Sequence, residues 1–127
     1  MRTKYKAWDG EKWHTEGVFV SHDGAVWHRP KGQREMRRVS WKVVWWTGLH
    51  EKNGVEIYEG DIVKRYEEVN ESYGFRICEA QYSLPRACFQ LVQADHECFG
   101  WPTKTEEKLE VIGNIHEHPH LFNNQKV

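Results

Sequence analysis

The sequence predicts an all-β protein, and three observations lead to this fold class. Apolar residues recur mostly at every second position, as they do on strands with one buried face. Dipeptides that favour tight turns, such as Asp9-Gly10 and Asn53-Gly54, separate the apolar runs. No long segment has the 3.6-residue apolar period of an amphipathic helix. We therefore expect a barrel-like, SH3-like or partly open barrel with hairpin additions.

The first 28 residues predict two hairpins. Apolar and basic residues alternate over 4–7, and Asp9-Gly10 then offers a turn. The segment 18–20 precedes a second turn at His22-Asp23-Gly24, after which 25–27 forms the returning strand.

The middle of the chain predicts further strands after an interruption. The segment 29–38 contains a proline, a glycine and four arginines, and it breaks the alternation. Residues 39–46 resume as a strand whose far end is apolar on both faces. Asn53-Gly54 predicts a hairpin turn, and Glu59-Gly60-Asp61 predicts a turn into the next strand.

The last part predicts a polar loop and three strands. The loop covers 67–74, the strands lie near 75–82, 87–93 and 109–112, and 94–106 is irregular by pattern. A turn-rich tail follows. Since no linker, repeat or low-complexity tract occurs, we expect one domain over residues 1–127.

Composition excludes several classes of protein. The chain has 127 residues, a formal net charge of −1 and a mean hydropathy of −0.83. A charge this small provides no overall attraction to nucleic acid or to anionic membranes, so any such binding requires a local patch. Seven Trp, five Tyr and five Phe favour a folded core over disorder.

The cysteines and the apolar runs indicate where the protein acts. Cys78, Cys88 and Cys98 are odd in number and form no CxxC pair, which disfavours a disulfide framework and favours a reducing compartment. The chain contains no run of about 18 consecutive apolar residues, so no membrane span is predicted. The first six residues precede no apolar stretch, so we expect no signal peptide. The expected location is the cytoplasm.

Three stretches, in order along the chain, resemble the YopX family of small proteins carried by bacteriophages and prophages. They are Lys4-Tyr5-Lys6-Ala7-Trp8-Asp9, the run from Trp46-Thr47-Gly48-Leu49 through Asn53 to Val63, and Val111-Ile112-Gly113-Asn114-Ile115 followed by Pro119. The resemblance implies a β-rich, barrel-like fold and a phage or prophage setting in a bacterial cytoplasm. It implies no activity, so no catalytic position is carried over.

The family motif has a structural interpretation. On a strand, Glu59 and Asp61 point the same way with Glu56 nearby, and paired carboxylates can divide acid and base roles or bind Mg²⁺. Turn chemistry is the favoured interpretation, because Gly60 permits the turn and Asp61 can accept backbone N–H groups. The residues assigned to this structural motif are Asn53, Gly54, Glu59, Gly60, Asp61, Gly113 and Asn114.

The chain departs from the family pattern at three places, 29–38, 94–101 and 116–120, and we expect features particular to this protein there. In 116–120, His116, His118 and His120 alternate, so an extended segment would place three imidazoles on one face, as a zinc site requires. Pro119 interrupts the segment, and a solvated, turn-forming tail is the favoured interpretation. A reactive cysteine with His96 as base is a further, weaker alternative.

The basic stretch near residue 30 is the strongest candidate for a binding site. Cations neutralise phosphates and aromatic rings stack on bases, which together hold nucleic acid. The alternative is a solvated loop with its tryptophans facing the core. The candidate residues for nucleic-acid or partner binding are Trp27, Arg29, Lys31, Arg34, Arg37, Arg38, Trp41 and Lys42.

Taken together, the sequence predicts a phage or prophage accessory protein that acts as a binding or interaction module. The expected partner is a host or phage protein, with no membrane and no cofactor involved, and the abundant tryptophans also suit assembly into a homo-oligomer. The alternative is a nucleic-acid-binding module that uses residues 27–42. A metal-dependent enzyme ranks third.

Overall fold

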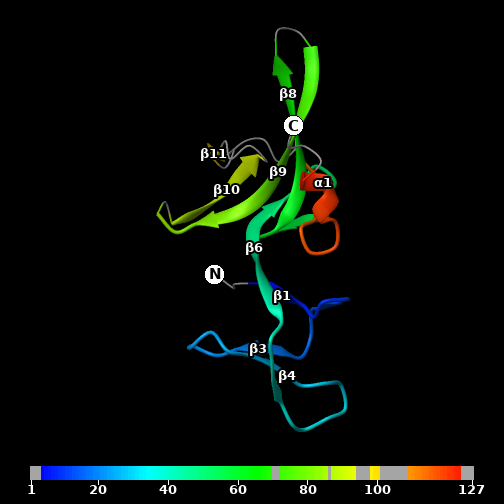
Figure 1. The fold of residues 1–127 in the computed structure, drawn as a ribbon, viewed down its shortest axis with the longest axis vertical. Coiled ribbons are helices and arrows are strands. Elements are labelled where there is room, and N and C mark those ends of the chain that lie inside the picture. Colours follow the sequence, from blue (N-terminus) through cyan, green and yellow to red (C-terminus); the bar gives the residue numbers. More distant parts are fainter. Residues whose placement is uncertain (1–3, 70–71, 86, 94–97, 101–108, 124–127) are drawn as a thin grey trace. The chain divides into compact units, whose positions relative to one another are not determined.

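The structure is a computed structural model that describes residues 4–69, 72–85, 87–93, 98–100 and 109–123. The predicted all-β class is confirmed, since these residues form three antiparallel sheets and one short helix (Figure 1). Within the described residues, none of the three sheets closes into a barrel.

The chain divides into two compact units, which we call unit 1 (residues 1–45) and unit 2 (residues 46–127). The single domain expected over residues 1–127 stays a prediction. Among the described residues, no helix is long and apolar enough to cross a membrane.

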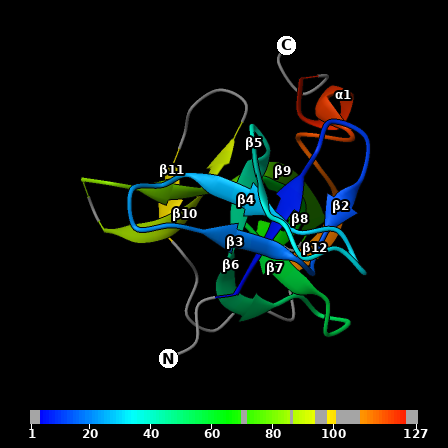
Figure 2. The same ribbon diagram turned by 90° about the horizontal axis from the view of Figure 1, so that it is seen from below.

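Unit 1 consists of short strands and tight turns. Its three-stranded sheet has the order β3-β4-β5, and β1 pairs with β2 and with the first half of β6 (Figure 2). Both predicted N-terminal hairpins are confirmed. The strands are β1 (Tyr5–Trp8), β2 (Trp13–His14), β3 (Val18–Val20), β4 (Val26–His28), β5 (Arg37–Val39) and β6 (Lys42–His50).

The strand predicted over 39–46 differs from the observed structure. It begins earlier, at Arg37, and it is divided at Ser40-Trp41 into β5 and β6. The division follows from pairing, because β5 bonds to β4 whereas β6 bonds to β1. Apolar alternation across such a break looks continuous in sequence.

Unit 2 contains a five-stranded antiparallel sheet with the order β11-β10-β9-β8-β12. Its β8–β9 hairpin pairs from Ile62↔Glu79 to Val69↔Ser72. The elements are the end of β6, then β7 (Glu56–Tyr58), β8 (Asp61–Val69), β9 (Ser72–Ser83), β10 (Cys88–Gln93), β11 (Cys98–Gly100), β12 (Leu109–Asn114) and α1 (Pro119–Asn123).

The predicted loop over 67–74 is wrong, because residues 67–69 and 72–74 belong to β8 and β9. Backbone hydrogen bonds hold a two-stranded ribbon together, so this part of the hairpin does not need the apolar alternation of a core strand. From the irregular segment 94–106, residues 98–100 form β11, and 94–97 and 101–106 lie outside the described residues.

The hydrophobic core of unit 2 lies on one face of its sheet. Val63 pairs with Cys78 and Leu91 pairs with Ala80, so these side chains share a face. All of the core side chains are fully shielded from solvent. They are Ile57, Val63, Cys78, Ala80, Leu91 and Leu109.

The motif residues of the sequence analysis lie in turns of unit 2 and at the ends of its strands β8 and β12. The Glu51 carboxylate is buried and accepts backbone N–H groups from Asn53 (2.6 Å), Val55 (3.2 Å) and Val111 (3.3 Å). Gly54 has φ +85° at the Asn-Gly turn. The Asp61 carboxylate accepts the Tyr58 N–H at 2.7 Å.

Two further glycines, one in a turn and one in β12, contact the C-terminal segment. Gly60 donates to the Ala80 carbonyl at 2.7 Å, and its carbonyl accepts the Ile115 N–H at 2.9 Å. At Gly113, a Cβ atom would lie 2.7 Å from Nδ1 of His118, so only glycine fits. β12 also shifts register between Val111 and Gly113.

Candidate nucleic-acid interface

One face of the β3-β4-β5 sheet combines aromatic and cationic side chains. Phe19 lies opposite Trp27, and Trp27 lies opposite Arg38, so the three residues form a row on the same face. Arg29 follows Trp27 by two residues and shares this face, with its guanidinium 5.7 Å from the centre of the Phe19 ring. We call these four residues the aromatic–cationic face.

Within unit 1, the side chains of this face are exposed enough for a binding partner to reach them. Phe19 is 40% exposed, Arg29 and Arg38 are exposed, and Trp27 is partly buried. A large aromatic residue that stays exposed on a small sheet contributes little to folding, but it offers a stacking surface. The face can therefore contact flat rings and negative charge together.

Strand alternation divides the basic stretch between two faces. Arg37 lies opposite His28 in β4, so its side chain leaves the sheet on the face away from Arg38. Arg34 is exposed in the loop between β4 and β5, and Lys42 is exposed opposite Trp8. The eight predicted residues thus do not form one cluster.

Trp41 belongs to a second cluster, together with two imidazoles. The His14 ring stacks on Trp41 with centroids 4.3 Å apart and planes at 20°. The His28 ring packs at 4.5 Å from Trp41 and 5.3 Å from His14. These contacts fit the alternative interpretation, in which Trp41 packs within the protein and does not stack on a base.

Asp9 orients this second cluster. Its Oδ2 lies 2.7 Å from Nε2 of His14, and its Oδ1 accepts the backbone N–H groups of Glu11 (2.7 Å) and Lys12 (2.8 Å). These hydrogen bonds, with the one from His14 the largest, lower the pKa of Asp9 to about 2. Asp9 is therefore an anion at neutral pH, and it fixes the ring of His14.

His28 differs from His14 in its surroundings. Burial lowers the pKa of His28, and the nearby His14 and Arg37 lower it further. His28 is thus a neutral imidazole at pH 7, able to donate one hydrogen bond and accept another.

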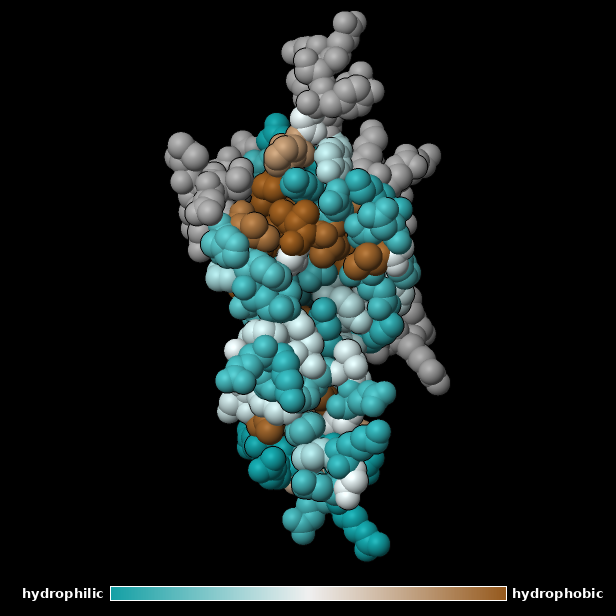
Figure 3. Space-filling view, turned by 90° about the vertical axis from the view of Figure 1, so that its right-hand side faces the viewer, coloured by the Kyte–Doolittle hydropathy of each residue, from teal (hydrophilic) through white to brown (hydrophobic). Residues whose placement is uncertain are grey.

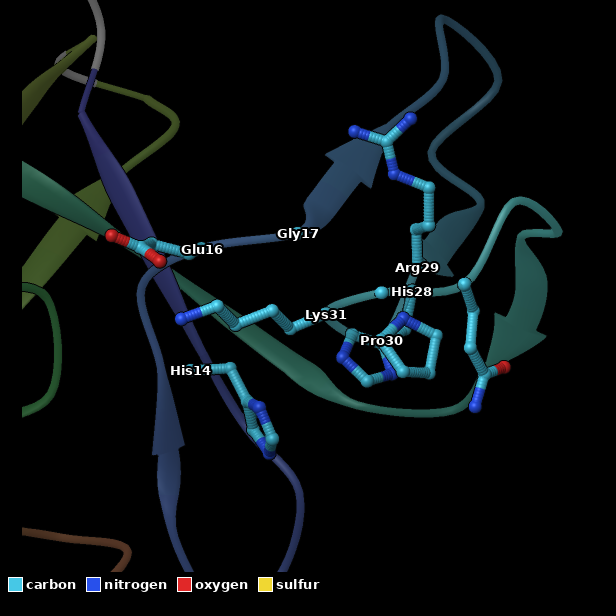
Figure 4. A pocket seen from close by; sticks show the side chains of 9 residues that line it. His14, Glu16, Gly17, His28, Arg29, Pro30 and Lys31 are labelled. Carbon is cyan, nitrogen blue, oxygen red and sulfur yellow. The ribbon is translucent and has the colours of Figure 1, made fainter.

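A cavity of about 450 Å³ opens beside these imidazoles (Figure 4). Its walls come from His14 at the end of β2, from Glu16 and Gly17 just before β3, and from the segment 28–33, which begins at the end of β4. In the figure, Lys31 extends from its turn toward His14 and Glu16, while the guanidinium of Arg29 points away. A small organic ligand fits such a volume.

The cavity wall depends on one glycine. A Cβ atom at Gly17 would lie 2.5 Å from the Arg29 carbonyl oxygen, and the residue has φ +69°. The Gly17 carbonyl accepts the Arg29 N–H at 2.9 Å, which ties β3 to the end of β4.

The predicted histidine site has a different geometry from the one expected. Residues 116–120 are not extended, because the Asn114 side chain accepts the N–H groups of His116 and Glu117 and α1 begins at Pro119. The rings of His118 and His120 lie 6.3 Å apart. In the part of the chain that is described, no group of three or more His, Cys, Asp or Glu side chains is placed to hold a metal.

The cysteines do not form a site with the predicted base. Cys78 is buried in the core and Cys88 is exposed at the start of β10. His96 lies outside the described residues.

Sequence reasoning missed Phe19, Asp9, His14 and His28. Phe19 could have been found from the second predicted hairpin. The length of its turn sets the strand register, and this register pairs Phe19 with Trp27. No local pattern indicates the other three, since His28 and His14 lie 13 and 27 positions before Trp41.

A known protein family and solved structures resemble this chain. The family model described as YopX protein matches residues 4–123. The crystal structure of protein EF1440 from Enterococcus faecalis is similar, with a TM-score of 0.63 and 23% identity over 96% of this chain and 99% of that one. Protein YopX from Bacillus subtilis has a TM-score of 0.67 and 24% identity over 96% and 97%. The comparison with curated proteins gives no match.

Proposed function

The chain belongs to the YopX family, and we propose that its unit 1 binds single-stranded nucleic acid. The family resemblance suggests the setting, an accessory protein of a phage or prophage that acts in the bacterial cytoplasm. One observation carries the proposal: Phe19, Trp27 and Arg38 stand in one row of a small sheet, with Arg29 beside them.

The chemistry of this face suits an unpaired strand. Each base has an aromatic face that can stack on Phe19 or Trp27, and the two guanidinium groups can neutralise phosphates along the backbone. In a duplex the bases already stack on one another, and reading them requires an element that enters a groove. The exposed face of this three-stranded sheet therefore favours single strands over duplex.

Fluorescence anisotropy with labelled single-stranded DNA, single-stranded RNA and duplex, at two salt concentrations, tests the proposal. We expect single-strand binding that weakens as salt rises, and a smaller salt dependence for Arg38→Ala, by about one phosphate contact. The Trp27→Ala variant should lose roughly 1–3 kcal/mol of binding free energy, the value of one stacked base.

Arg37→Ala is the matched control, because Arg37 is the adjacent arginine of β5 and faces the other way. It should bind like the unaltered protein. Absence of single-strand binding at low salt contradicts the proposal. Equal losses in the Arg37→Ala and Arg38→Ala variants would show that charge alone, and not the face, is responsible.

A protein partner is the second candidate, and it is favoured by exposed apolar side chains in unit 2. Figure 3 shows apolar residues gathered on one face of this unit, and further apolar side chains are exposed away from that face. At the turn between β9 and β10, Leu84 is 83% exposed and Tyr82 is 43% exposed, with the Tyr82 ring 5.2 Å from that of Phe89. This candidate is supported if the protein captures host or phage proteins and the Leu84→Asp variant does not. Sedimentation would detect binding of a second copy of the chain.

A further inference from the structure

The cavity of unit 1 combines two charged groups that have no ion-pair partner with an aromatic wall. Lys31 and Glu16 line it from opposite sides, and neither makes an ion pair among the described residues. A ligand that is only anionic would be repelled by Glu16, and one that is only cationic would be repelled by Lys31. The ligand should thus offer both a negative group and hydrogen-bond donors.

The aromatic wall narrows the class of ligand further. His14 is held by Asp9 and stacked on Trp41, so its ring is fixed before any ligand arrives. A preorganised ring favours a flat partner that can lie against it. Of the lysine and arginine that line the cavity, Lys31 extends into it and can meet a phosphate, because the guanidinium of Arg29 points away.

We propose that this cavity binds a nucleotide through its phosphate at Lys31 and through donors of its base or sugar at Glu16. The volume of about 450 Å³ lies within the range of small-molecule sites. Gln33 adds an amide that can donate to and accept from a base edge. The ligand is either a free mononucleotide or the 5′-phosphorylated end of a strand, which share this chemistry. The second form rests on the function proposed above.

Isothermal titration of the full chain with nucleoside 5′-monophosphates, the corresponding nucleosides and inorganic phosphate tests the site. We expect at least one monophosphate to bind more tightly than both its nucleoside and inorganic phosphate. Lys31→Ala should weaken that binding roughly ten- to a hundredfold, toward the nucleoside level. Glu16→Gln, which keeps an acceptor but loses the charge, should weaken it less.

Arg34→Ala is the matched control, since Arg34 is a cation of the same loop that does not line the cavity. It should bind as the unaltered protein does. The proposal is overturned when no monophosphate binds more tightly than inorganic phosphate, or when Arg34→Ala weakens binding as much as Lys31→Ala.

Oligonucleotides with and without a 5′-phosphate separate the two forms of the ligand. Tighter binding of the phosphorylated strand, lost in Lys31→Ala, assigns the strand end. Equal binding of both strands together with binding of a monophosphate assigns the free nucleotide. Trp27→Ala and Arg38→Ala separate the two proposals, because they should weaken strand binding and leave monophosphate binding unchanged.

Discussion

The two units of the chain differ in the side-chain contacts that stabilise each of them internally. Among the described residues, unit 2 buries a contiguous set of aliphatic side chains around Ile57, Val63 and Leu91. In residues 4–45 of unit 1, the buried apolar side chains are small ones, namely Ala7, Val18, Ala25 and Val44. This unit relies in addition on stacked rings and on a carboxylate that caps a turn. Unit 2 has the core expected of a stable scaffold, and unit 1 leaves its larger aromatic side chains accessible to ligands.

The largest expected effect concerns the core of unit 2. Leu91 is fully buried, so Leu91→Ala removes apolar contacts and leaves a cavity, at a cost of about 2–5 kcal/mol in the free energy of unfolding. Urea denaturation monitored by circular dichroism measures it. Val44→Ala in unit 1 is the comparison, and it should cost less because a valine loses fewer atoms. A loss below about 1 kcal/mol for Leu91→Ala would argue against a packed core in unit 2.

Next in size is the polar anchor of unit 2. Glu51→Ala leaves three backbone N–H groups without their acceptor, which should cost about 2–4 kcal/mol, because some of them then gain water. Glu51→Gln keeps one oxygen acceptor and should cost less. Equal stability of the two variants, measured by thermal unfolding, would refute the importance of these hydrogen bonds.

A glycine pair tests how tightly the cavity wall of unit 1 is built. Gly17→Ala forces a Cβ atom against the Arg29 carbonyl, and we expect a loss of about 1–3 kcal/mol with weaker ligand binding. Gly24 also has a positive φ, of +87°, but nothing lies within 4 Å of its Cβ position. Gly24→Ala should therefore cost only the backbone strain and leave the cavity intact. Unfolding and titration of both variants give the comparison.

The smallest expected effect is the pH dependence of unit 1. The pKa of Asp9 is lowered from 3.8 to about 2 by its hydrogen bonds, so its contribution to stability is present above pH 3.8 and is lost as pH falls toward 2. Burial lowers the pKa of His28 below 6.5, so the unfolded chain binds this proton more readily, and stability falls as pH drops below 6.5.

Both groups therefore destabilise unit 1 in acid, in two separate pH windows. His28→Gln should flatten the slope of stability against pH just below 6.5 and leave the slope near pH 3 unchanged. Asp9→Asn should do the reverse. A slope just below pH 6.5 that persists in His28→Gln would assign it to another histidine.

Turns were the part of the fold that could be predicted from sequence. Asp9-Gly10, His22-Asp23-Gly24 and Asn53-Gly54 each lie in the turn where their local chemistry placed them. Their conformations depend on neighbours within a few residues. The error at 67–74 has the opposite cause, because backbone pairing between β8 and β9 extends through residues whose side chains predict a loop.

The candidate site was predicted only in part. The density of arginines after Trp27 indicated where to look, and Arg29 and Arg38 do lie on a face with Trp27. The same pattern did not separate Arg37 from Arg38, since that requires knowing that both are in a strand and how the strand pairs. It also did not indicate that Lys31 lines a cavity with Glu16.

The sequence by itself determined the all-β class, the positions of the turns and the family to which the chain belongs. These follow from side-chain alternation and from turn residues, which act over short distances along the chain. Only the tertiary structure decided which arginines share a face with Phe19. It also brought His14 and His28 together with Asp9 and Trp41, and placed the two imidazoles at a cavity. Register and long-range packing set these contacts, because a shift of one residue turns every side chain to the other face of a strand.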